Sequence, residues 1–405
     1  AASPHPELGR RLRRPAAARN PRDLFGAVDR SGSHSVKYEL SGKPDGIQMW
    51  VADMDLPCCP SIVRAIRERA AHPNFGYTIQ PGEAWDAVGR WLVARQGWTR
   101  SPAREEFVFS ASVVTSFCNV LRVFTSEGDA VLVMTPLYAP LRRAIVGCGR
   151  RLVEHHLGPA GELQLDAAGS LARRLDQEGV KLVLLCNPQN PSGRVWRRGE
   201  LGALATECAR RELLVVADEI WADWVLPGSP CPFVPFASVA APAGCAHIAL
   251  GAPTKTYSLA GLHASYLVIP DAGQRQRYKD YVEPAFLSYG STFATAALLA
   301  AYVDEAQGSW LRAARAHVAA NVERLDASLA PGVRLLRPEA TYCAWLDFSG
   351  LGLRGEALAV RLGDAGLVLA PGSEFDGSGA SDHLGRINLA CPREMLDRAC
   401  AALRQ

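Results

Sequence analysis

Residues 251–265 read GAPTKTYSLAGLHAS and place Lys255 just beyond a short apolar run, HIALG at residues 247–251. Such a run is typical of a buried strand. An earlier run, LLVVADEIW at residues 213–221, ends its apolar part at Asp218. Ligands of open α/β sheets bind outside the carboxyl ends of the strands. The pattern therefore predicts that Lys255 and Asp218 serve one ligand.

A lysine and a carboxylate in this arrangement are typical of sites for pyridoxal 5'-phosphate (PLP), where the lysine forms a Schiff base and the carboxylate faces the ring nitrogen. On residues 251–265 alone, a lysine in a surface loop would be the favoured alternative. Three further stretches of the same chain favour PLP instead: PLYAP at 136–140, NPQNPSG at 187–193 and GRINLACPR at 385–393.

The composition indicates a globular protein of enzyme size with a small-molecule partner. Its 405 residues allow two domains, and its net charge of +3 comes from scattered Lys and Arg, so we expect neither nucleic acid nor membrane as a partner. No apolar run reaches the roughly 18 residues of a membrane span, so a cytoplasmic protein is expected. Cys58 and Cys59 are adjacent and lack zinc-site spacing, so no metal is expected.

Residues 1–20 lack core-forming side chains and predict a disordered arm. From residue 129 onward, apolar runs alternate with helix-like stretches such as 198–211, which predicts an α/β domain with a mostly parallel sheet and helices on both faces. We expect this large PLP-binding domain to span residues 61–290.

The later part of the chain changes character. Residues 309–329 read as a long amphipathic helix, 341–348 as a strand and 356–367 as another helix. We expect a small α+β domain at 291–405, to which residues 21–60 contribute. The Gly-rich residues 372–385 favour a mobile loop over a phosphate cradle, because no Walker-type lysine follows them.

With these motifs the chain resembles the fold-type I PLP enzymes of the aminotransferase class I/II superfamily, and more narrowly their cystathionine β-lyase branch of C–S lyases. The narrower likeness extends from about residue 21 to the end and rests on SVKYEL (35–40), MWVADMDL (49–56), NFGYT (74–78), NPQNPSGRVW (187–196) and INLACPR (387–393). It implies a seven-stranded, mostly parallel sheet in the large domain. Within MWVADMDL, Asp53 and Asp55 are interpreted as holding the loop.

The resemblance implies a role for each motif residue near the PLP ring. Lys255 would form the Schiff base and remove the substrate α-proton. Asp218 would keep the pyridine nitrogen protonated and would have a depressed pKa beside that cation. Tyr138 would stack on the ring and take part in catalysis. Asn190 would donate its amide to the ring phenolate oxygen and help bind the substrate, whose α-carboxylate the Arg386 guanidinium would clamp.

The same likeness implies the phosphate contacts. Backbone N–H groups of Ser112, Val113 and Val114 would bind the phosphate where a helix begins, and His263 would lie near it. Tyr77 would reach the phosphate of the neighbouring subunit. A homodimer with shared active sites is therefore expected.

Five positions depart from the family pattern. Trp221 stands near the phenolate oxygen where relatives have His or Tyr, and indole can donate a hydrogen bond but cannot exchange a proton. Ala252 replaces a phosphate-binding serine, and His263 replaces a Lys, Arg or Gln. Ser258 replaces an Asn, and Ser112 replaces a glycine. PLP binding is expected to survive, whereas the reaction outcome is open.

The leading hypothesis is a C–S β-lyase that converts a cysteine S-conjugate, such as cystathionine, to a thiol, pyruvate and ammonia. An aminotransferase, or a decarboxylating or oxidatively deaminating enzyme of specialised metabolism, is the alternative within the fold. A regulatory protein that keeps PLP as a structural ligand is the alternative of another class, and the intact Lys255, Asp218 and Arg386 argue against it. The sequence does not identify the group on the sulfur.

Overall fold

The apolar runs between Phe107 and Val268 form one seven-stranded sheet. The computed structural model describes residues 25–158, 170–303 and 306–405, so the predicted arm at 1–20 lies outside the described residues. The strands are β2 (Phe107–Ser110), β3 (Ala130–Thr135), β4 (Arg151–His156), β5 (Val180–Cys186), β6 (Leu214–Asp218), β7 (His247–Gly251) and β8 (Ser265–Val268).

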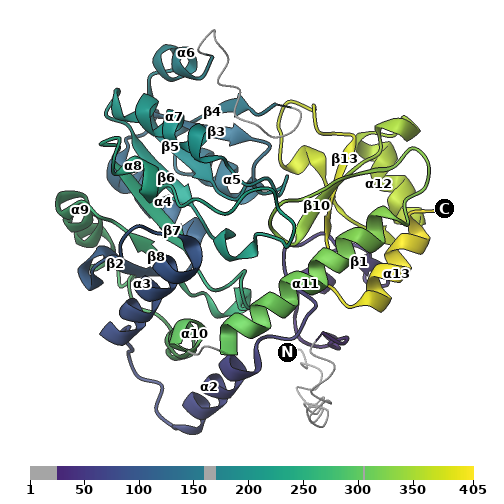
Figure 1. The fold of residues 1–405 in the computed structure, drawn as a ribbon, viewed down its shortest axis with the longest axis horizontal. Helices are drawn as coiled ribbons and strands as arrows, with labels where there is room; N and C mark the ends of the chain where they lie inside the picture. Colours follow the sequence, from purple (N-terminus) through teal and green to yellow (C-terminus); the bar gives the residue numbers. More distant parts are fainter. Residues whose placement is uncertain (1–24, 159–169, 304–305) are drawn as a thin grey trace, which may run out of the picture.

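The sheet has the strand order β2-β8-β7-β6-β5-β3-β4 (Figure 1). β8 runs antiparallel to both of its neighbours, and the other described pairings in this sheet are parallel. The predicted α/β class and the mostly parallel, seven-stranded sheet are confirmed.

Helices cover both faces of this sheet because its strands are apolar on both sides. Along β3, Val131 and Val133 face one apolar cluster, and Leu132 and Met134 face another. The period of two sends alternate side chains to opposite faces. The first cluster packs on α4 (Val113–Phe124), α5 (Ala139–Gly147) and α9 (Ala272–Val282), and the second on α6 (Ser170–Gln177), α7 (Arg198–Ala209) and α8 (Ala237–Ala240).

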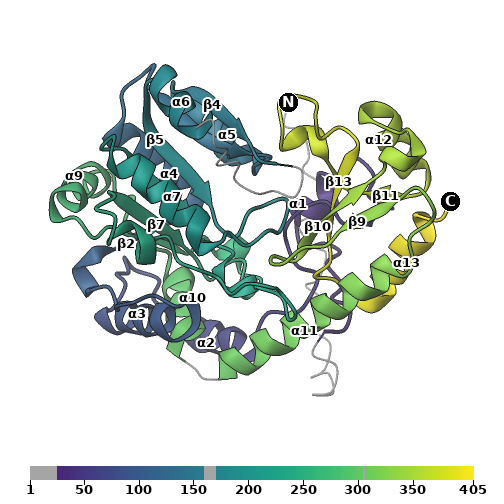
Figure 2. The same ribbon diagram turned by 45° about the horizontal axis from the view of Figure 1, so that its top comes forward.

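Three further helices lie beside the antiparallel end of the sheet, as Figure 2 shows. They are α2, α3 and α10, and the apolar helix α10 packs on the other two. A fourth helix, the long α11, leads from α10 to the C-terminal part. Their bounds are α2 (Pro60–Ala71), α3 (Gly82–Gln96), α10 (Thr292–Val303) and α11 (Ala306–Asp326).

A four-stranded antiparallel sheet, in the order β12-β13-β10-β9, organises the C-terminal part. Its strands are β9 (Arg334–Leu336), β10 (Cys343–Asp347), β12 (Ala370–Pro371) and β13 (Leu384–Asn388), and the helices beside it are α12 (Gly355–Asp364) and α13 (Arg393–Ala402). The N-terminal segment joins this part, since β1 (Ile47–Gln48) pairs with β11 (Leu367–Val368). The division at residues 60 and 290 stays a proposal.

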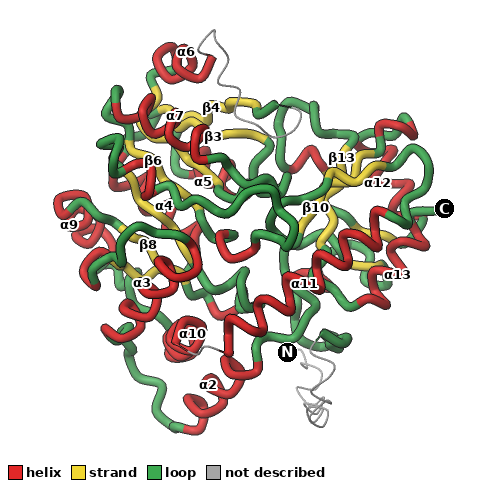
Figure 3. The backbone as a smooth tube through the Cα atoms, viewed as in Figure 1, coloured by secondary structure: helices red, strands yellow, loops and turns green. Residues whose placement is uncertain are grey.

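Loops from both sheets meet between them, at the carboxyl edge of the large sheet (Figure 3). No helix among the described residues is long and apolar enough to span a bilayer. The described residues also hold no cluster of three or more His, Cys, Asp or Glu side chains with the geometry of a metal site.

Candidate active site

A cavity of about 170 Å³ opens at the carboxyl edge of the large sheet. Its walls come from the N-terminus of α4 and from the segments that follow β3, β5, β6 and β7. The lining residues include Ala52, Ser112, Val113, Val114, Tyr138, Asn190, Asp218, Trp221, Lys255 and His263. Nine of the eleven predicted site residues therefore line one cavity.

Lys255 extends into the cavity from the turn after β7. Its Nζ donates a hydrogen bond to the carbonyl oxygen of Ala52 at 2.6 Å, and its own carbonyl accepts one from Trp224 Nε1 at 2.8 Å. Burial lowers the pKa of the Lys255 amine, and nearby thiol and carboxyl groups oppose that shift. Burial therefore shifts the Lys255 equilibrium toward the neutral amine, which is the form that can accept a proton.

Asp218 ends β6 and is almost fully buried. The backbone N–H of Ile220 donates to its Oδ1 at 3.2 Å. Burial nevertheless raises the pKa of the Asp218 carboxyl to about 6, because this hydrogen bond and the charge of Lys255 only partly offset the loss of water. The depressed pKa expected for Asp218 refers to the carboxyl beside a cationic ring nitrogen, and it stays a prediction for the PLP-bound enzyme.

Arg386 lies on β13 and contacts Asn190, which lines the cavity. Its Nη1 donates to Asn190 Oδ1 at 3.0 Å and its Nη2 to the carbonyl of Trp50 at 2.8 Å. The guanidinium carbon lies 4.7 Å from the centre of the Phe375 ring. The buried Nε has no hydrogen-bond partner in the described structure. An unpaired N–H on a buried guanidinium is suited to a carboxylate ligand.

Helix α4 begins at the cavity wall. Ser112 caps this helix, and its hydroxyl oxygen accepts a hydrogen bond from the N–H of Thr115 at 3.0 Å. The N–H groups of Val113 and Val114 belong to the first turn, which has no acceptors within the helix. An anion such as a phosphate suits this position, because the helix dipole and free N–H groups favour negative charge.

Tyr138 and Trp221 form apolar walls. Tyr138 lies at the start of α5, and burial raises the pKa of its phenol. Trp221 is 1% exposed, and its ring meets the Tyr342 ring edge-on at 4.7 Å. The Lys255 Nζ lies 5.8 Å from the centre of the Trp221 ring. Two aromatic side chains therefore line the cavity that holds the Lys255 amine and the Asp218 carboxyl.

Two predicted residues lie outside the cavity lining. Arg386 contacts the cavity through Asn190, as described above. Tyr77 is 96% exposed, and this chain does not bring it to the cavity. Among the departures, Ser258 has a left-handed φ of 61°, a conformation that Asn adopts more readily than most residues. No contact in the structure explains why Ser stands here in place of Asn.

Sequence reasoning missed several contributors to the site. The carbonyls of Trp50 and Ala52 and the rings of Tyr342 and Phe375 contact the predicted residues. The motif MWVADMDL marked the loop that carries Trp50 and Ala52, but a backbone acceptor leaves no signature in the side-chain sequence. The Lys255 amine and the buried Asp218 carboxyl thus share one cavity, and the Arg386 guanidinium, with its unpaired Nε, lies beside it. This set of groups fits PLP.

Comparisons with known proteins agree with this fit. The model of the aminotransferase class I and II family matches residues 44–403. Cystathionine β-lyase PatB of Bacillus subtilis (strain 168) is 35% identical over 376 residues, which are 90% of this chain and 94% of that protein. Protein MalY of Escherichia coli (strain K12) is 29% identical over 94% of this chain and 97% of its own length.

A solved structure supports the same assignment. The crystal structure of cystalysin from Treponema denticola, which contains PLP, matches with a TM-score of 0.86 and 26% identity. The match covers 94% of this chain and 98% of that one. The predicted fold type, PLP cofactor and enzyme class are confirmed. The chain therefore belongs to the aminotransferase class I and II family of PLP-dependent fold-type I enzymes, in its cystathionine β-lyase branch of C–S lyases.

Proposed function

We propose that this enzyme is a C–S β-lyase that cleaves an S-substituted L-cysteine of the cystathionine type to a thiol, pyruvate and ammonia. One observation carries the proposal. The Lys255 amine, whose pKa burial lowers, shares a cavity with the buried Asp218 carboxyl, and the Arg386 guanidinium keeps one buried N–H unpaired beside it. The names of the relatives above support the reaction class.

Each residue then has a distinct task. Bound here, PLP would supply a ring that accepts electron density from the substrate Cα. Asp218 would hold a proton on the ring nitrogen. Arg386 would bind the substrate carboxylate through Nε, while its Nη1 contact keeps Asn190 in place. Lys255 would take the α-proton as a neutral amine.

The sulfur leaves from the carbon next to Cα. Overall, the conjugate and one water yield thiol, pyruvate and ammonium, so the α-proton removed by Lys255 balances the proton that the thiol gains. Once protonated, Lys255 is the cation that can give this proton to the leaving sulfur, because it is the only lysine among the described residues that line the cavity. Tyr138 would keep water from the ring face.

The decisive experiment is incubation of the purified enzyme with simple S-alkyl-L-cysteines. Pyruvate, thiol, carbon dioxide and oxygen consumption are scored separately. Equal amounts of pyruvate and thiol, without carbon dioxide or oxygen use, are expected. Keto acid that retains sulfur would indicate an aminotransferase instead, and carbon dioxide release would indicate a decarboxylating enzyme. Intact conjugate in every assay would favour the regulatory protein.

Replacing Arg386 with lysine is expected to weaken amino acid binding by roughly tenfold or more. A lysine ammonium cannot keep the contacts of Nη1 and Nη2 and also offer the carboxylate an N–H at the position of Nε. The PLP spectrum should be unchanged, because the proposed ring and phosphate contacts come from other residues. Spectral titration with an L-amino acid and with its decarboxylated amine measures the effect. Equal affinity of the parent enzyme for both ligands would contradict this role of Arg386.

We also propose a homodimer with shared active sites. The segments 74–79 and 286–293 lie side by side, because Thr78 pairs with Gly290 and Phe75 contacts Phe293 at a ring distance of 5.7 Å. They expose large apolar side chains, with Tyr77 at 96% and Phe286 at 65%. Exposed large apolar side chains on two adjoining segments are typical of an interface.

Tyr77→Phe tests the shared site. The variant should keep the dimer and the fold but bind PLP several-fold more weakly, because it loses only a hydrogen bond to the phosphate. Sedimentation analysis and a PLP dissociation assay measure the two effects. The matched control is Phe286→Ala, which changes the same surface and leaves the Tyr77 hydroxyl in place. A fully active monomer at assay concentration would overturn the proposal.

Trp221 carries the second candidate function, a decarboxylating or oxidatively deaminating reaction, because its indole can donate a hydrogen bond but cannot act as an acid or base. Trp221→His is expected to change the thiol-to-carbon-dioxide ratio from one cysteine conjugate by several-fold, since it restores a titratable group and frees volume. The ratio is measured at matched conversion. Trp224→Phe, which changes a neighbouring indole bonded to the Lys255 carbonyl, is the comparison. A constant ratio with altered turnover would make Trp221 a packing residue.

A further inference from the structure

Residues 49–56, here called the carbonyl loop, present an unbroken series of backbone acceptors. The five successive carbonyl oxygens from Trp50 to Met54 each accept a hydrogen bond from a side chain. The donors are Arg386 to Trp50, Asn388 to Val51, Lys255 and Tyr342 to Ala52, Lys37 and Asn388 to Asp53, and Arg30 to Met54. Irregular backbone that is buried needs such partners.

Two of these donors are the cations of the candidate active site. The loop holds the Lys255 amine at Ala52 and the Arg386 guanidinium at Trp50, two residues apart in the sequence. The position of the Ala52 carbonyl therefore decides where the amine rests when it is not bonded to PLP. A small shift of the loop would move the amine relative to the substrate Cα.

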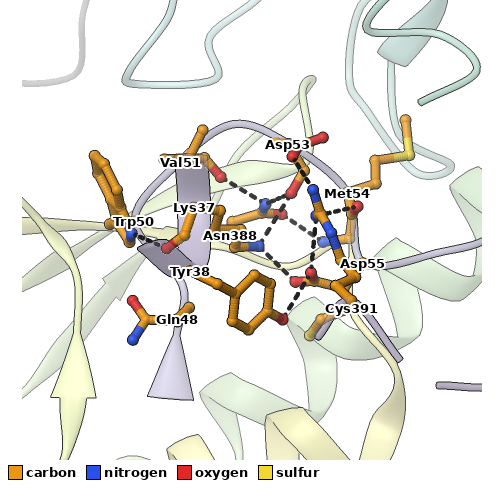
Figure 4. Close-up of polar contacts among 12 residues, drawn as sticks. Lys37, Tyr38, Gln48, Trp50, Val51, Asp53, Met54, Asp55, Asn388 and Cys391 are labelled. Atoms are coloured by element: carbon orange, nitrogen blue, oxygen red, sulfur yellow. Dashed lines mark hydrogen bonds and ion pairs between the residues drawn. The ribbon is translucent and has the colours of Figure 1, made fainter. Parts of the chain in front are cut away.

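The far side of the carbonyl loop rests on a buried ionic network (Figure 4). Lys37, from the short helix α1 (Val36–Glu39), is 1% exposed, and its Nζ donates to Asp55 Oδ2 at 2.5 Å and to the Asp53 carbonyl at 3.0 Å. Arg30 bridges the carboxylates of Asp53 and Asp55 at 2.6 and 3.2 Å. Tyr38 donates to Asp55 at 3.0 Å. This geometry agrees with the expectation that Asp53 and Asp55 hold the loop.

The two ends of the carbonyl loop are held differently. The N-terminal end is tied to the strands, since Met49 N–H donates to the Val368 carbonyl and Asn388 N–H donates to the Met49 carbonyl. At the C-terminal end, the Asp55 N–H donates to the Ala390 carbonyl, and Lys37 is the side chain that joins the Asp53 carbonyl to the Asp55 carboxylate. Loss of Lys37 should therefore disturb Ala52, and with it Lys255, more than Trp50 and Arg386.

We propose that the Lys37–Asp55 ion pair is a positioning device for the Lys255 amine, acting through the Ala52 carbonyl of the carbonyl loop. The proposal rests on the proposed role of Lys255 as the α-proton base. It gives the N-terminal segment a function in catalysis, although none of its charged groups lines the cavity. Neither Lys37 nor Asp55 lines the cavity.

The test replaces Lys37 with methionine, which keeps the length of the side chain and removes the ammonium. Exchange of the α-proton of L-alanine into D₂O is followed by NMR, and L-alanine binding is followed by spectral titration. We expect at least a tenfold slower exchange at saturation, with binding changed less than threefold. L-Alanine carries no leaving group, so failure of the C–S lyase proposal would not affect this result.

Two variants separate positioning from stability. Arg211→Met removes a half-buried cation that pairs with Asp176 and Glu207 beside the start of β6, at the opposite edge of the sheet. It should lower the thermal midpoint without changing exchange. Lys37→Met combined with Asp55→Asn also removes the buried carboxylate that has lost its Lys37 partner, so stability should partly recover. Exchange should stay slow, because the Asp53 carbonyl still lacks the Lys37 ammonium and keeps only the Asn388 amide as a side-chain donor.

The single variant could fail to fold, and the double variant then decides. Exchange within twofold of the parent in a folded Lys37 variant would overturn the proposal. So would an equal loss of exchange and of L-alanine binding, because that pattern indicates general loosening of the site. A second measurement needs no PLP: the rate at which an acylating reagent modifies the Lys255 amine in the apoprotein. This rate should rise at least threefold in Lys37→Met and stay unchanged in Arg211→Met.

Discussion

Replacing Lys255 with alanine is expected to abolish the visible absorbance of lysine-bound PLP and to slow α-proton removal by roughly a thousandfold, within the range for loss of a general base. Lys255 is the one amine among the described residues that line the cavity, and burial lowers the pKa of its ammonium. Absorbance spectra and α-proton exchange of L-alanine in D₂O measure the two effects.

The control for this prediction is Lys181→Ala, which removes an exposed lysine from β5. Borohydride reduction followed by peptide mapping should label Lys255 in the parent enzyme and in the Lys181 variant. Labelling of another lysine, or unchanged absorbance in Lys255→Ala, would remove Lys255 from the proposed mechanism. Both outcomes are independent of which group the substrate carries on its sulfur.

The positions of Lys255 and Asp218 could be predicted because they follow from a local rule. Each lies at the end of a short apolar run, and the alternation of such runs with helix-like stretches implies that the runs are neighbouring parallel strands. The same rule located Asn190 and Tyr138. Arg386 depended on the family motif, because β13 belongs to a different sheet from the one that carries the cavity.

The supporting contacts could not be predicted, because they join distant parts of the chain through the backbone. The Tyr342 hydroxyl donates to the carbonyl of Ala52 across 290 residues of sequence. Phe375, within the Gly-rich stretch that favoured a mobile loop, is buried against Arg386. Lys37 reads as an ordinary lysine of a short polar segment. Nothing local predicts that it pairs with Asp55 in the interior.

Replacing Asp218 with asparagine is expected to cost about 3 kcal/mol of transition-state stabilisation, which slows turnover roughly a hundredfold or more. Asparagine keeps the shape of the side chain and an oxygen for the Ile220 N–H, so PLP should still bind. It cannot hold a proton on the ring nitrogen as a carboxylate does. Turnover and PLP dissociation are measured side by side, and a variant within threefold of the parent would show that the ring nitrogen is not used.

Glu219→Gln is the matched control for this variant. Glu219 is also buried, and its pKa is raised to about 8, chiefly by burial, but its Oε1 accepts the N–H of Phe236 at 2.6 Å and it does not line the cavity. Its replacement should leave turnover unchanged. A large loss of turnover in Glu219→Gln would mean that any change at the end of β6 disturbs the site, and the effect of Asp218→Asn would then not report on the ring nitrogen.

The pH dependence of apoprotein stability tests the same carboxyl group without catalysis. Burial raises the pKa of Asp218 from 3.8 to about 6, so the protonated form is favoured by folding. The stability that this group contributes is therefore fully present below about pH 4 and is lost as the pH rises through about 6. The Asp218→Asn apoprotein should lose less of its thermal midpoint over that window than the parent. Parallel curves would mean that Asp218 is hydrated before PLP binds, and the cationic ring nitrogen would then not be needed to stabilise its ionised form.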